Sequence, residues 1–535
     1  MIKNCLSFLL FIIAPTVSNA QNQTDILHYK FNLQLNDKND SIFGTTTIRF
    51  IAQKQTQSIS LDLQNINASG KGMIVTQIND DSNSKDKILF SHQNNKLILN
   101  LTDYKRTNDT LQLNIFYKGI PADGLIISKN KYGNRTFFSD NWPDRAHYWL
   151  PCNDRPDDKA SFEFFVTAPD HYQVISNGVL VEASNLKNNL KLTHWREEIP
   201  LPTKIMVIGV ASFAVNYIGN VNDCIPVSSW VFPENKEAGF YDYAMAKDIL
   251  NFYINYIGPY PYKKLANVQS KTIFGGMENA GAIFYHENSV VGNREEESLF
   301  AHEIVHQWFG DMASEQNFSH LWLSEGFATY LTHIYYESKY GTEEFHTRLI
   351  ADRSEVISYL KYANKPIVDS ITPRRQLINT NNYARAGWVL HMLRNKVGDS
   401  AFHSIIRTYY ESYKGKNAYT KDFQKVAEKI SGQSLDSFFD QWLYQPVIPK
   451  LAFIWKYDSK SKQIIITVTQ KQQTAPFQFQ LEISWPSGNK SNTIQKLEIS
   501  KKEETFTIPV PTKPQQILID PQIKLLFEGN VTEDK

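Results

Sequence analysis

The sequence has 535 residues, which exceeds what one hydrophobic core usually supports, so two to four domains are expected. With 42% hydrophobic and 21% charged residues, the composition is that of a globular protein and excludes a disordered or fibrous chain. A net charge of +1 gives no reason to expect a nucleic acid or an anionic membrane as partner.

The first twenty residues have the pattern of a secretory signal peptide. Lys3 supplies the positive charge, residues 5–17 form an apolar run too short to span a bilayer, and residues 18–20 resemble a small-residue cleavage site. We expect the mature protein to be exported, as a periplasmic or secreted protein. An uncleaved anchor is the alternative. No later apolar run has transmembrane length, so no stable membrane span is expected.

Two cysteines, Cys152 and Cys224, follow the expected cleavage site. An oxidising compartment would permit a disulfide between them. Two cysteines in so long a chain are more often separate buried thiols, and both readings stay open.

Residues 21–216 are expected to form an N-terminal antiparallel β domain of sandwich type. Short alternating or β-branched runs lie at residues 31–35, 45–51, 97–101 and 111–115. Asn177-Gly178 predicts a hairpin turn. The chain therefore begins as a β protein after the signal peptide.

Residues 217–445 are expected to form a mostly helical domain, because the apolar period changes to that of helices. The predicted helices cover residues 236–257, 294–312, 324–340, 343–361, 382–397, 400–413, 420–431 and 435–442. Residues 446–535 return to strands at 464–468, 477–483, 505–510 and 516–518, and the pattern stops near Leu526. The fold class is therefore multidomain α+β with a small C-terminal β-sandwich.

The segment His302-Glu303-Ile304-Val305-His306 carries the clearest chemical signal. Two histidines four residues apart on a helix project from one face, close enough for both imidazoles to bind one metal ion. Glu303 is placed to take a proton from a water at that metal. The alternative is a solvent-exposed helix whose two histidines are unrelated and form no metal site.

Glu325 follows the second histidine after a spacer of 18 residues. Because two helices joined by a short turn can face each other, Glu325 can serve as the third ligand. A third protein ligand leaves the fourth tetrahedral position of zinc open for water, as in catalytic sites. The constellation therefore predicts a hydrolase, with an amide bond as the expected target.

The segment Gly275-Gly276-Met277-Glu278-Asn279 precedes His302 by about 23 residues. Paired glycines in a strand allow a ligand to approach the backbone and to pair as an extra strand. Without its context, the segment would be read as a β-bulge or turn with an ordinary surface glutamate.

The order of these motifs resembles that of the aminopeptidase N-like zinc aminopeptidases, which include leukotriene hydrolase. Three further stretches are similar to signatures of that family and extend the resemblance over nearly all of the mature chain: residues 151–163, 383–393 and 518–521. The resemblance implies a thermolysin-like catalytic domain, one Zn²⁺ per chain, and peptides with a free N-terminus as substrates.

The resemblance also implies roles for individual residues. His302, His306 and Glu325 would bind zinc, and Glu303 would act as general base and then as proton donor to the leaving amine. Tyr383 would hydrogen-bond the oxyanion of the tetrahedral intermediate. The substrate-binding residues would be those of the glycine-rich segment, with Glu278 on the free α-ammonium: Gly275, Gly276, Met277, Glu278 and Asn279.

The sequence departs from the family pattern at three places. Arg385-Ala386 stand where the family usually has Lys-Gly, a mild change that leaves Tyr383 aligned. Ten residues before Cys152, where relatives usually carry Gln or Glu, this chain has Trp142. The preference of relatives for a particular first residue of the substrate therefore cannot be assumed for this chain. No large C-terminal helical domain is expected. The active-site cleft is then either more exposed to solvent or covered by a partner subunit. Whether the protein forms a homo-oligomer is left undecided by the sequence.

Three other functions are weaker alternatives. Epoxide hydrolysis of a lipid occurs in one branch of the family, and nothing in this sequence specifically supports it. A peptide-binding protein without activity would be expected to lack a ligand, Glu303 or Tyr383, and all are present. A zinc endopeptidase is compatible with the metal motif, but Glu278 argues against it.

Overall fold

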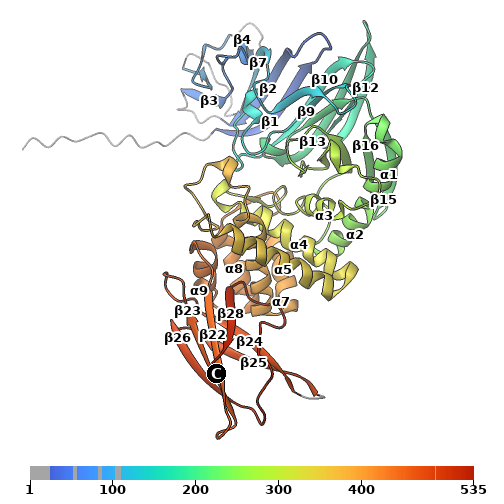
Figure 1. Cartoon of the computed structure of the whole chain (residues 1–535). Coiled ribbons are helices and arrows are strands. Elements are labelled where there is room, and N and C mark those ends of the chain that lie inside the picture. The colour runs from blue at the N-terminus through green and yellow to red at the C-terminus, as the bar shows by residue number, and fades with distance from the viewer. Residues whose placement is uncertain (1–23, 52–56, 82–86, 103–109, 488–489, 535) are drawn as a thin grey trace, which may run out of the picture.

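The computed structural model describes residues 24–51, 57–81, 87–102, 110–487 and 490–534. The expected signal peptide lies outside these residues. Figure 1 shows the N-terminal strands at one end of the molecule, the helices in the middle and the C-terminal strands at the other end. The multidomain α+β fold class is thus confirmed.

The N-terminal part of the chain forms three β-sheets. A seven-stranded sheet has the order β12-β13-β10-β1-β2-β7-β4. Its strands are β1 (Asp25–Gln34), β2 (Ile42–Ile51), β4 (Gly72–Asp80), β7 (Thr110–Ile120), β10 (Ala160–Pro169), β12 (Val179–Leu186) and β13 (Leu190–Leu201). The four-stranded sheet contains β8 (Leu125–Lys129), β9 (Arg135–Ser139), β11 (Gln173–Ser176) and β14 (Ile208–Ala211), and the three-stranded sheet contains β3 (Ser58–Asp62), β5 (Phe90–Gln93) and β6 (Lys96–Asn100).

Two expectations for this part need correction. The seven-stranded sheet is not wholly antiparallel, because β1 pairs with β10 in parallel. The hairpin predicted at Asn177-Gly178 is wrong: β11 pairs with β14 and β12 pairs with β13, so the turn joins two different sheets. The buried side chain of Asn177 instead donates hydrogen bonds to the carbonyls of Ile205 and Ala280, which fixes the crossing.

The central part combines a five-stranded sheet with helices. The sheet has the order β15-β16-β17-β19-β18 and consists of β15 (Ala214–Val221), β16 (Ile225–Val231), β17 (Leu265–Ser270), β18 (Gly276–Met277) and β19 (Ala282–His286). The expected domain boundary at residues 216–217 falls inside β15. The helices are α1 (Lys236–Tyr243), α2 (Ala246–Tyr256), α3 (Glu297–Val305), α4 (Trp322–Tyr340), α5 (Thr342–Tyr359), α6 (Ala386–Val397), α7 (Asp399–Tyr413), α8 (Thr420–Ser431) and α9 (Asp436–Phe439).

Four predicted helices are shorter or interrupted. Those predicted at residues 382–397 and 435–442 are α-helical over α6 and α9, with π-helical turns at Asn381–Arg385 and Asp440–Tyr444. The helix predicted at residues 236–257 is broken between α1 and α2, where the Met245 amide bonds the carbonyl of Asp242 in a tighter turn. The helix predicted at 294–312 ends as α3 at Val305. Its continuation is turned back at Gly310, whose φ of +115° is outside the helical region. Two short strands, β20 (Ser314–Glu315) and β21 (Asn417–Ala418), pair beyond this turn.

The C-terminal part contains a four-stranded sheet, β26-β23-β22-β28, and a three-stranded sheet, β25-β24-β27. Their strands are β22 (Lys450–Asp458), β23 (Gln463–Gln470), β24 (Phe479–Ser487), β25 (Lys490–Ile499), β26 (Glu503–Pro509), β27 (Leu518–Ile519) and β28 (Glu528–Glu533). The expectation that the strand pattern stops near Leu526 is wrong, because β28 pairs with β22. Most residues of β28 are exposed, so the strand leaves no apolar pattern in the sequence.

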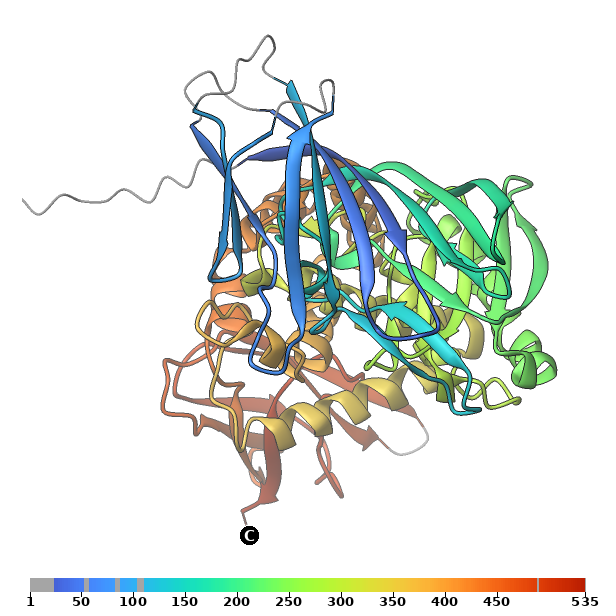
Figure 2. The same ribbon diagram turned by 90° about the horizontal axis from the view of Figure 1, so that it is seen from above.

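The N-terminal strands lie across the helices when the molecule is seen from above (Figure 2). Phe138 on β9 packs edge-to-face on Phe232 and Phe284, which join the four-stranded sheet to the five-stranded one. Cys152 is buried and Cys224 is exposed, and both are free, so the disulfide is excluded and the expectation of two buried thiols is wrong for Cys224. None of the helices among the described residues is long and apolar enough to cross a membrane.

Candidate metal centre and active site

The three predicted metal ligands lie together where α3 faces α4. The distance between Nε2 of His302 and Nε2 of His306 is 3.1 Å, and Oε2 of Glu325 lies 3.3 Å and 3.2 Å from these atoms. Ligands about 2.0–2.1 Å from a tetrahedral zinc ion are separated from one another by roughly 3.3 Å. The three atoms therefore already have the spacing of three corners of a zinc tetrahedron. Among the described residues, no other cluster of three or more histidine, cysteine or carboxylate side chains has the spacing of a metal site.

The charges around His306 favour a cation at this position. Burial lowers the pKa of His306, but the carboxylates of Glu325, Glu278 and Glu303 together outweigh burial and raise that pKa to about 10. Burial alone would raise the pKa of Glu325, yet the two histidines hold it well below its usual range. Two imidazoles and an ionised carboxylate are a donor set that fits zinc.

The ring of His306 is held from its other side. Its Nδ1 donates to the carbonyl of Phe309 at 3.0 Å and lies 3.2 Å from Oγ of Ser324. This fixes the tautomer and leaves the Nε2 lone pair for a metal. A Cβ at Gly310 would be 2.3 Å from Oγ of Ser324, so only glycine fits between the two residues. Sequence reasoning missed Gly310 and Ser324 as parts of the site.

The two residues expected to act on the substrate flank the ligands. The carboxylate of Glu303 packs against Gly276 on β18. Burial raises the pKa of Glu303, His306 opposes this shift, and the nearby Glu278 carboxylate adds to it. The Tyr383 ring stacks on that of His302, with centroids 5.8 Å apart and an interplanar angle of 10°.

Burial, together with the carboxylates of Glu325, Glu278 and Glu303, raises the pKa of Tyr383 well above its usual value, so the hydroxyl stays protonated as a hydrogen-bond donor.

The glycine-rich segment lies over the metal ligands at the edge of the five-stranded sheet. On one side β18 pairs with β19, and β18 ends the described strand order, so its other side is open to an incoming strand. Glu278 follows and is buried, and its carbonyl accepts a hydrogen bond from Gln307. Burial raises the pKa of Glu278, with His306 opposing the shift. Met277 is buried in the strand, and both polar side-chain atoms of the buried Asn279 lack a hydrogen-bond partner.

A buried ion pair near Glu278 joins the N-terminal domain to the central part of the chain. Lys204 donates to Oε1 of Glu315 at 2.5 Å, and both side chains are fully or nearly fully buried. The Lys204 ammonium lies 5.8 Å from the Phe318 ring centre and lowers the pKa of Glu278, although burial dominates. Sequence analysis gave no signal for this pair, because its members are 111 residues apart.

Tyr383 lies in a π-helical turn, Asn381–Arg385, that leads into α6. Arg385 is fully buried, and its guanidinium donates to the carbonyls of Lys365, Gln445 and Val447. The arginine at the family's lysine position therefore ties the turn of Tyr383 to the chain that enters the C-terminal domain.

Trp142 is buried in an aromatic cluster next to the glycine-rich segment. Its ring packs edge-to-face on Phe274 and Phe318, at centroid distances of 5.8 and 5.9 Å. Phe274 directly precedes Gly275, and Phe318 contacts Lys204. The position that departs from the family pattern thus forms an apolar wall close to Glu278.

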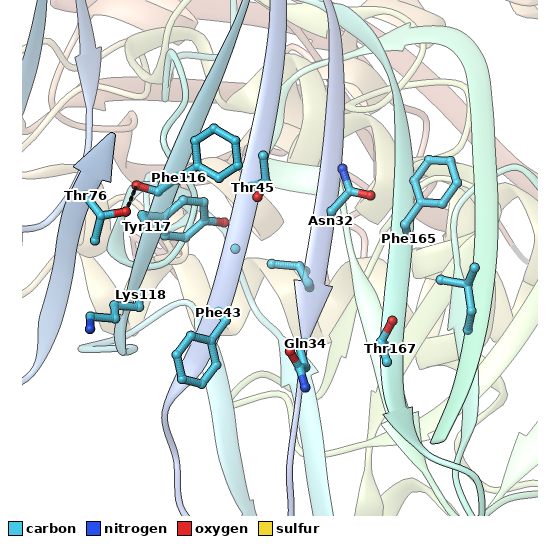
Figure 3. Close-up of a pocket in the computed structure, with 13 residues that line it drawn as sticks. Asn32, Gln34, Phe43, Thr45, Thr76, Phe116, Tyr117, Lys118, Phe165 and Thr167 are labelled. Carbon is cyan, nitrogen blue, oxygen red and sulfur yellow. Dashed lines mark hydrogen bonds between the residues drawn. The ribbon is translucent and has the colours of Figure 1, made fainter. Parts of the chain in front are cut away.

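The outer face of the seven-stranded sheet carries a separate shallow cavity of about 390 Å³ (Figure 3). Figure 3 shows its aromatic, amide and hydroxyl side chains, among them Phe116, Phe165, Asn32 and Thr45. None of the predicted site residues lines this cavity. It plays no part in the metal centre.

Known families match both larger domains. Residues 26–205 match the Peptidase M1 N-terminal domain, and residues 241–442 match the Peptidase family M1 domain. A glutamyl aminopeptidase of Bitis rhinoceros is 25% identical over an alignment of 419 residues that covers 72% of this chain and 42% of that protein. The chain thus spans about two fifths of the length of this protein and of two further curated relatives that it matches.

Two solved structures share the fold. Aminopeptidase A of Legionella pneumophila, in complex with aspartic acid, gives a TM-score of 0.80 at 15% identity and covers 95% of this chain and 59% of that chain. An M1 zinc metallopeptidase of Deinococcus radiodurans gives a TM-score of 0.69 at 22% identity, over 80% of this chain and 94% of that chain.

Proposed function

Because the chain belongs to peptidase family M1, as its two matched domains show, we propose that it removes N-terminal residues from peptides by zinc-dependent hydrolysis. The observation that carries the proposal is the position of Glu278 and the open edge of β18 beside the triad His302, His306 and Glu325. One zinc ion per chain fits this triad. The metal alone would suit any peptidase, whereas the buried carboxylate beside it selects a free amine.

Each residue around the metal site has a separate role in the proposed hydrolysis. When bound, zinc supplies a Lewis acid that polarises the scissile carbonyl and acidifies a water. A carboxylate oxygen of Glu303 accepts the proton of the attacking water and passes it to the leaving amine. The hydroxyl of Tyr383 donates a hydrogen bond to the oxygen on which negative charge develops.

Glu278 accounts for the choice of the first peptide bond. Its carboxylate is buried, so a substrate ammonium can bind it by a charge-assisted hydrogen bond. Such a bond is worth about 1.5–3 kcal/mol. The backbone of Gly275 and Gly276 pairs with the substrate strand, which places the first peptide bond at the metal.

A substrate panel tests this proposal. Mature protein of known zinc content is assayed on dipeptides with free and with N-acetylated amines, and Glu303→Gln serves as the inactive control. We expect cleavage of the free-amine substrates alone. Equal cleavage of both forms would show an endopeptidase, and zinc-loaded protein without any hydrolysis would favour a peptide-binding role.

We also propose that the protein is exported, as a periplasmic or secreted enzyme. The support is the signal-like pattern of residues 1–20 in the sequence. N-terminal sequencing of the protein from extracellular or periplasmic fractions should begin at Gln21. Recovery of the full-length chain in the membrane fraction would instead indicate an uncleaved anchor.

A further inference from the structure

Gln307 directly follows the metal ligand His306, beyond the end of α3, and its side chain is fully buried. Its Nε2 donates to the carbonyl of Glu278 at 2.6 Å and to Oδ2 of Asp311 at 3.0 Å. Both N–H groups of the amide are therefore used. None of the roles in the proposed hydrolysis requires this side chain.

The oxygen of the same amide contacts two donors. Oε1 accepts a hydrogen bond from the backbone amide of Gly281 at 2.7 Å, and the hydroxyl of Tyr260 lies 3.2 Å from it. Because a backbone N–H can only donate and a carbonyl can only accept, these partners determine which end of the Gln307 amide is nitrogen. The side chain therefore has a single orientation in the site.

Residues 278–281 form the turn that joins β18 to β19. Gln307 bridges the carbonyl at the start of this turn, on Glu278, and the amide at its end, on Gly281. Between them, the amide of Ala282 donates to the carbonyl of Asn279 at 2.9 Å. One side chain next to a metal ligand thus holds both ends of the turn that carries the amine-binding carboxylate.

We infer that Gln307 is a positioning residue, which sets the distance between the substrate's ammonium and the metal. His306 and Gln307 are adjacent, so the metal ligand and the support of Glu278 share one backbone segment. A displacement of the Glu278 carbonyl displaces its α-carbon and, with it, the carboxylate. The inference rests on the proposed function, because Glu278 must bind the free amine of the substrate.

The test measures, on the zinc-loaded enzyme, the inhibition constants of leucine hydroxamate and of the same hydroxamate without its α-amine. Both compounds offer the metal the same group, so the ratio of their constants reports the binding of the amine. The ratio refers to folded molecules alone, so a partial loss of folded protein does not change it. For the wild-type protein, the compound with the amine should bind about ten- to hundredfold more tightly, as expected for one charge-assisted hydrogen bond.

Gln307→Met keeps a side chain of similar length but removes the amide that bridges the turn. The ratio should fall close to one, while the amine-free hydroxamate binds as before and each chain keeps one zinc. Gln307→Asn retains the amide on a shorter side chain and should also lose the preference, because it cannot reach both ends of the turn. Where a variant hydrolyses substrate too slowly, calorimetric binding of the two hydroxamates gives the same ratio.

Gln269→Met is the matched control. Gln269 is also fully buried, and it accepts from the backbone amide of Phe232 and donates to Asn235 and to the carbonyl of Glu287. None of these partners belongs to the turn of residues 278–281. The loss of Gln269 should therefore lower Tm and leave the ratio of the two inhibition constants unchanged.

The possible failures are distinguishable. If the wild-type protein prefers the amine and both Gln307 variants keep this preference, the inference is wrong while the proposed function stands. An equal loss of the preference in Gln269→Met would show a general loosening of the site and would also overturn the inference. If the wild-type protein binds both hydroxamates equally, Glu278 does not select the amine, and the proposed function fails together with the inference.

Discussion

The α-carbon of Gly276 lies so close to the carboxylate of Glu303 that a Cβ at residue 276 would be 2.4 Å from Oε1. Strand β18 and helix α3 therefore meet without an intervening side chain. This contact sets the position of the carboxylate relative to the metal ligands.

We predict that Gly276→Ala displaces Glu303 and lowers kcat by about two orders of magnitude, the cost of misplacing a catalytic group by about 1 Å. Gly275→Ala is the matched control, because the nearest atom to its Cβ would be 3.7 Å away on Leu299. Steady-state kinetics and zinc content should be measured for both variants. Equal losses in the two variants would show that the contact with Glu303 does not matter.

Arg385 should act on Tyr383 through the π-helical turn they share. Because its guanidinium holds three backbone carbonyls, we predict that Arg385→Lys lowers kcat about tenfold with little change in KM or zinc content. Circular dichroism and thermal melting separate this effect from unfolding. A variant in which KM rises and zinc content falls together with kcat would point to general damage of the fold.

Removal of the metal should reduce both activity and stability. A ligand bound only by the folded state stabilises it by about 4 kcal/mol when its free concentration is 1,000 times Kd. Chelation should therefore abolish hydrolysis and lower Tm, and added Zn²⁺ should restore both. His306→Ala should not respond to zinc, whereas Glu303→Gln should keep one zinc per chain. An unchanged Tm after proven metal loss would contradict this prediction.

His391 should make folding sensitive to acid. Burial lowers its pKa to about 3, and its Nε2 donates to the carbonyl of Ile523. The unfolded chain has the ordinary histidine pKa near 6.5 and binds the proton first. The stabilisation is therefore complete above pH 6.5 and is lost as the pH falls towards 3, by about 3 kcal/mol at pH 4.5.

This prediction is checked by Tm between pH 7.5 and pH 4.5. His391→Gln should flatten the fall of Tm with acidification, and His171→Gln, at an exposed site, should not. Parallel curves for the wild-type protein and His391→Gln would exclude His391 as the cause.

Trp142 should influence which first residue is accepted. With Phe274 and Phe318 it forms an apolar wall near Glu278, so we expect apolar first residues to be cleaved faster than acidic ones. Trp142→Glu should raise the relative kcat/KM of a substrate with a basic first residue about tenfold. Aminoacyl nitroanilides that differ only in the first residue measure this. An unchanged substrate profile would place the wall outside the specificity pocket.

The arrangement of the metal ligands was predictable because it depends on local geometry. His302 and His306 share one helix face, and Glu325 lies on the next helix after a short connection. Strand β28 was not predictable, since an exposed strand needs no apolar pattern. The turn at Asn177-Gly178 shows a second limit: turn residues indicate that the chain reverses, and they do not determine which strands then pair.

The supporting contacts of the site could not be read from the sequence at all. The pair Lys204 and Glu315 joins residues 111 positions apart, and Arg385 reaches a carbonyl 62 residues away at Val447. Neither contact leaves a periodic or spaced pattern. They are determined by how the domains pack, and only the structure shows them.

The bond from Arg385 to Gln445 and Val447 also limits how this protein can be recombined. Residues 445–447 lead into β22, and the two acceptors are main-chain carbonyls, which every residue supplies. An exchange of the C-terminal domain with that of a relative would therefore disturb the Tyr383 turn by changing the path of this segment. Chimaeras should be joined after residue 447, with Arg385 and this segment inherited from the same parent.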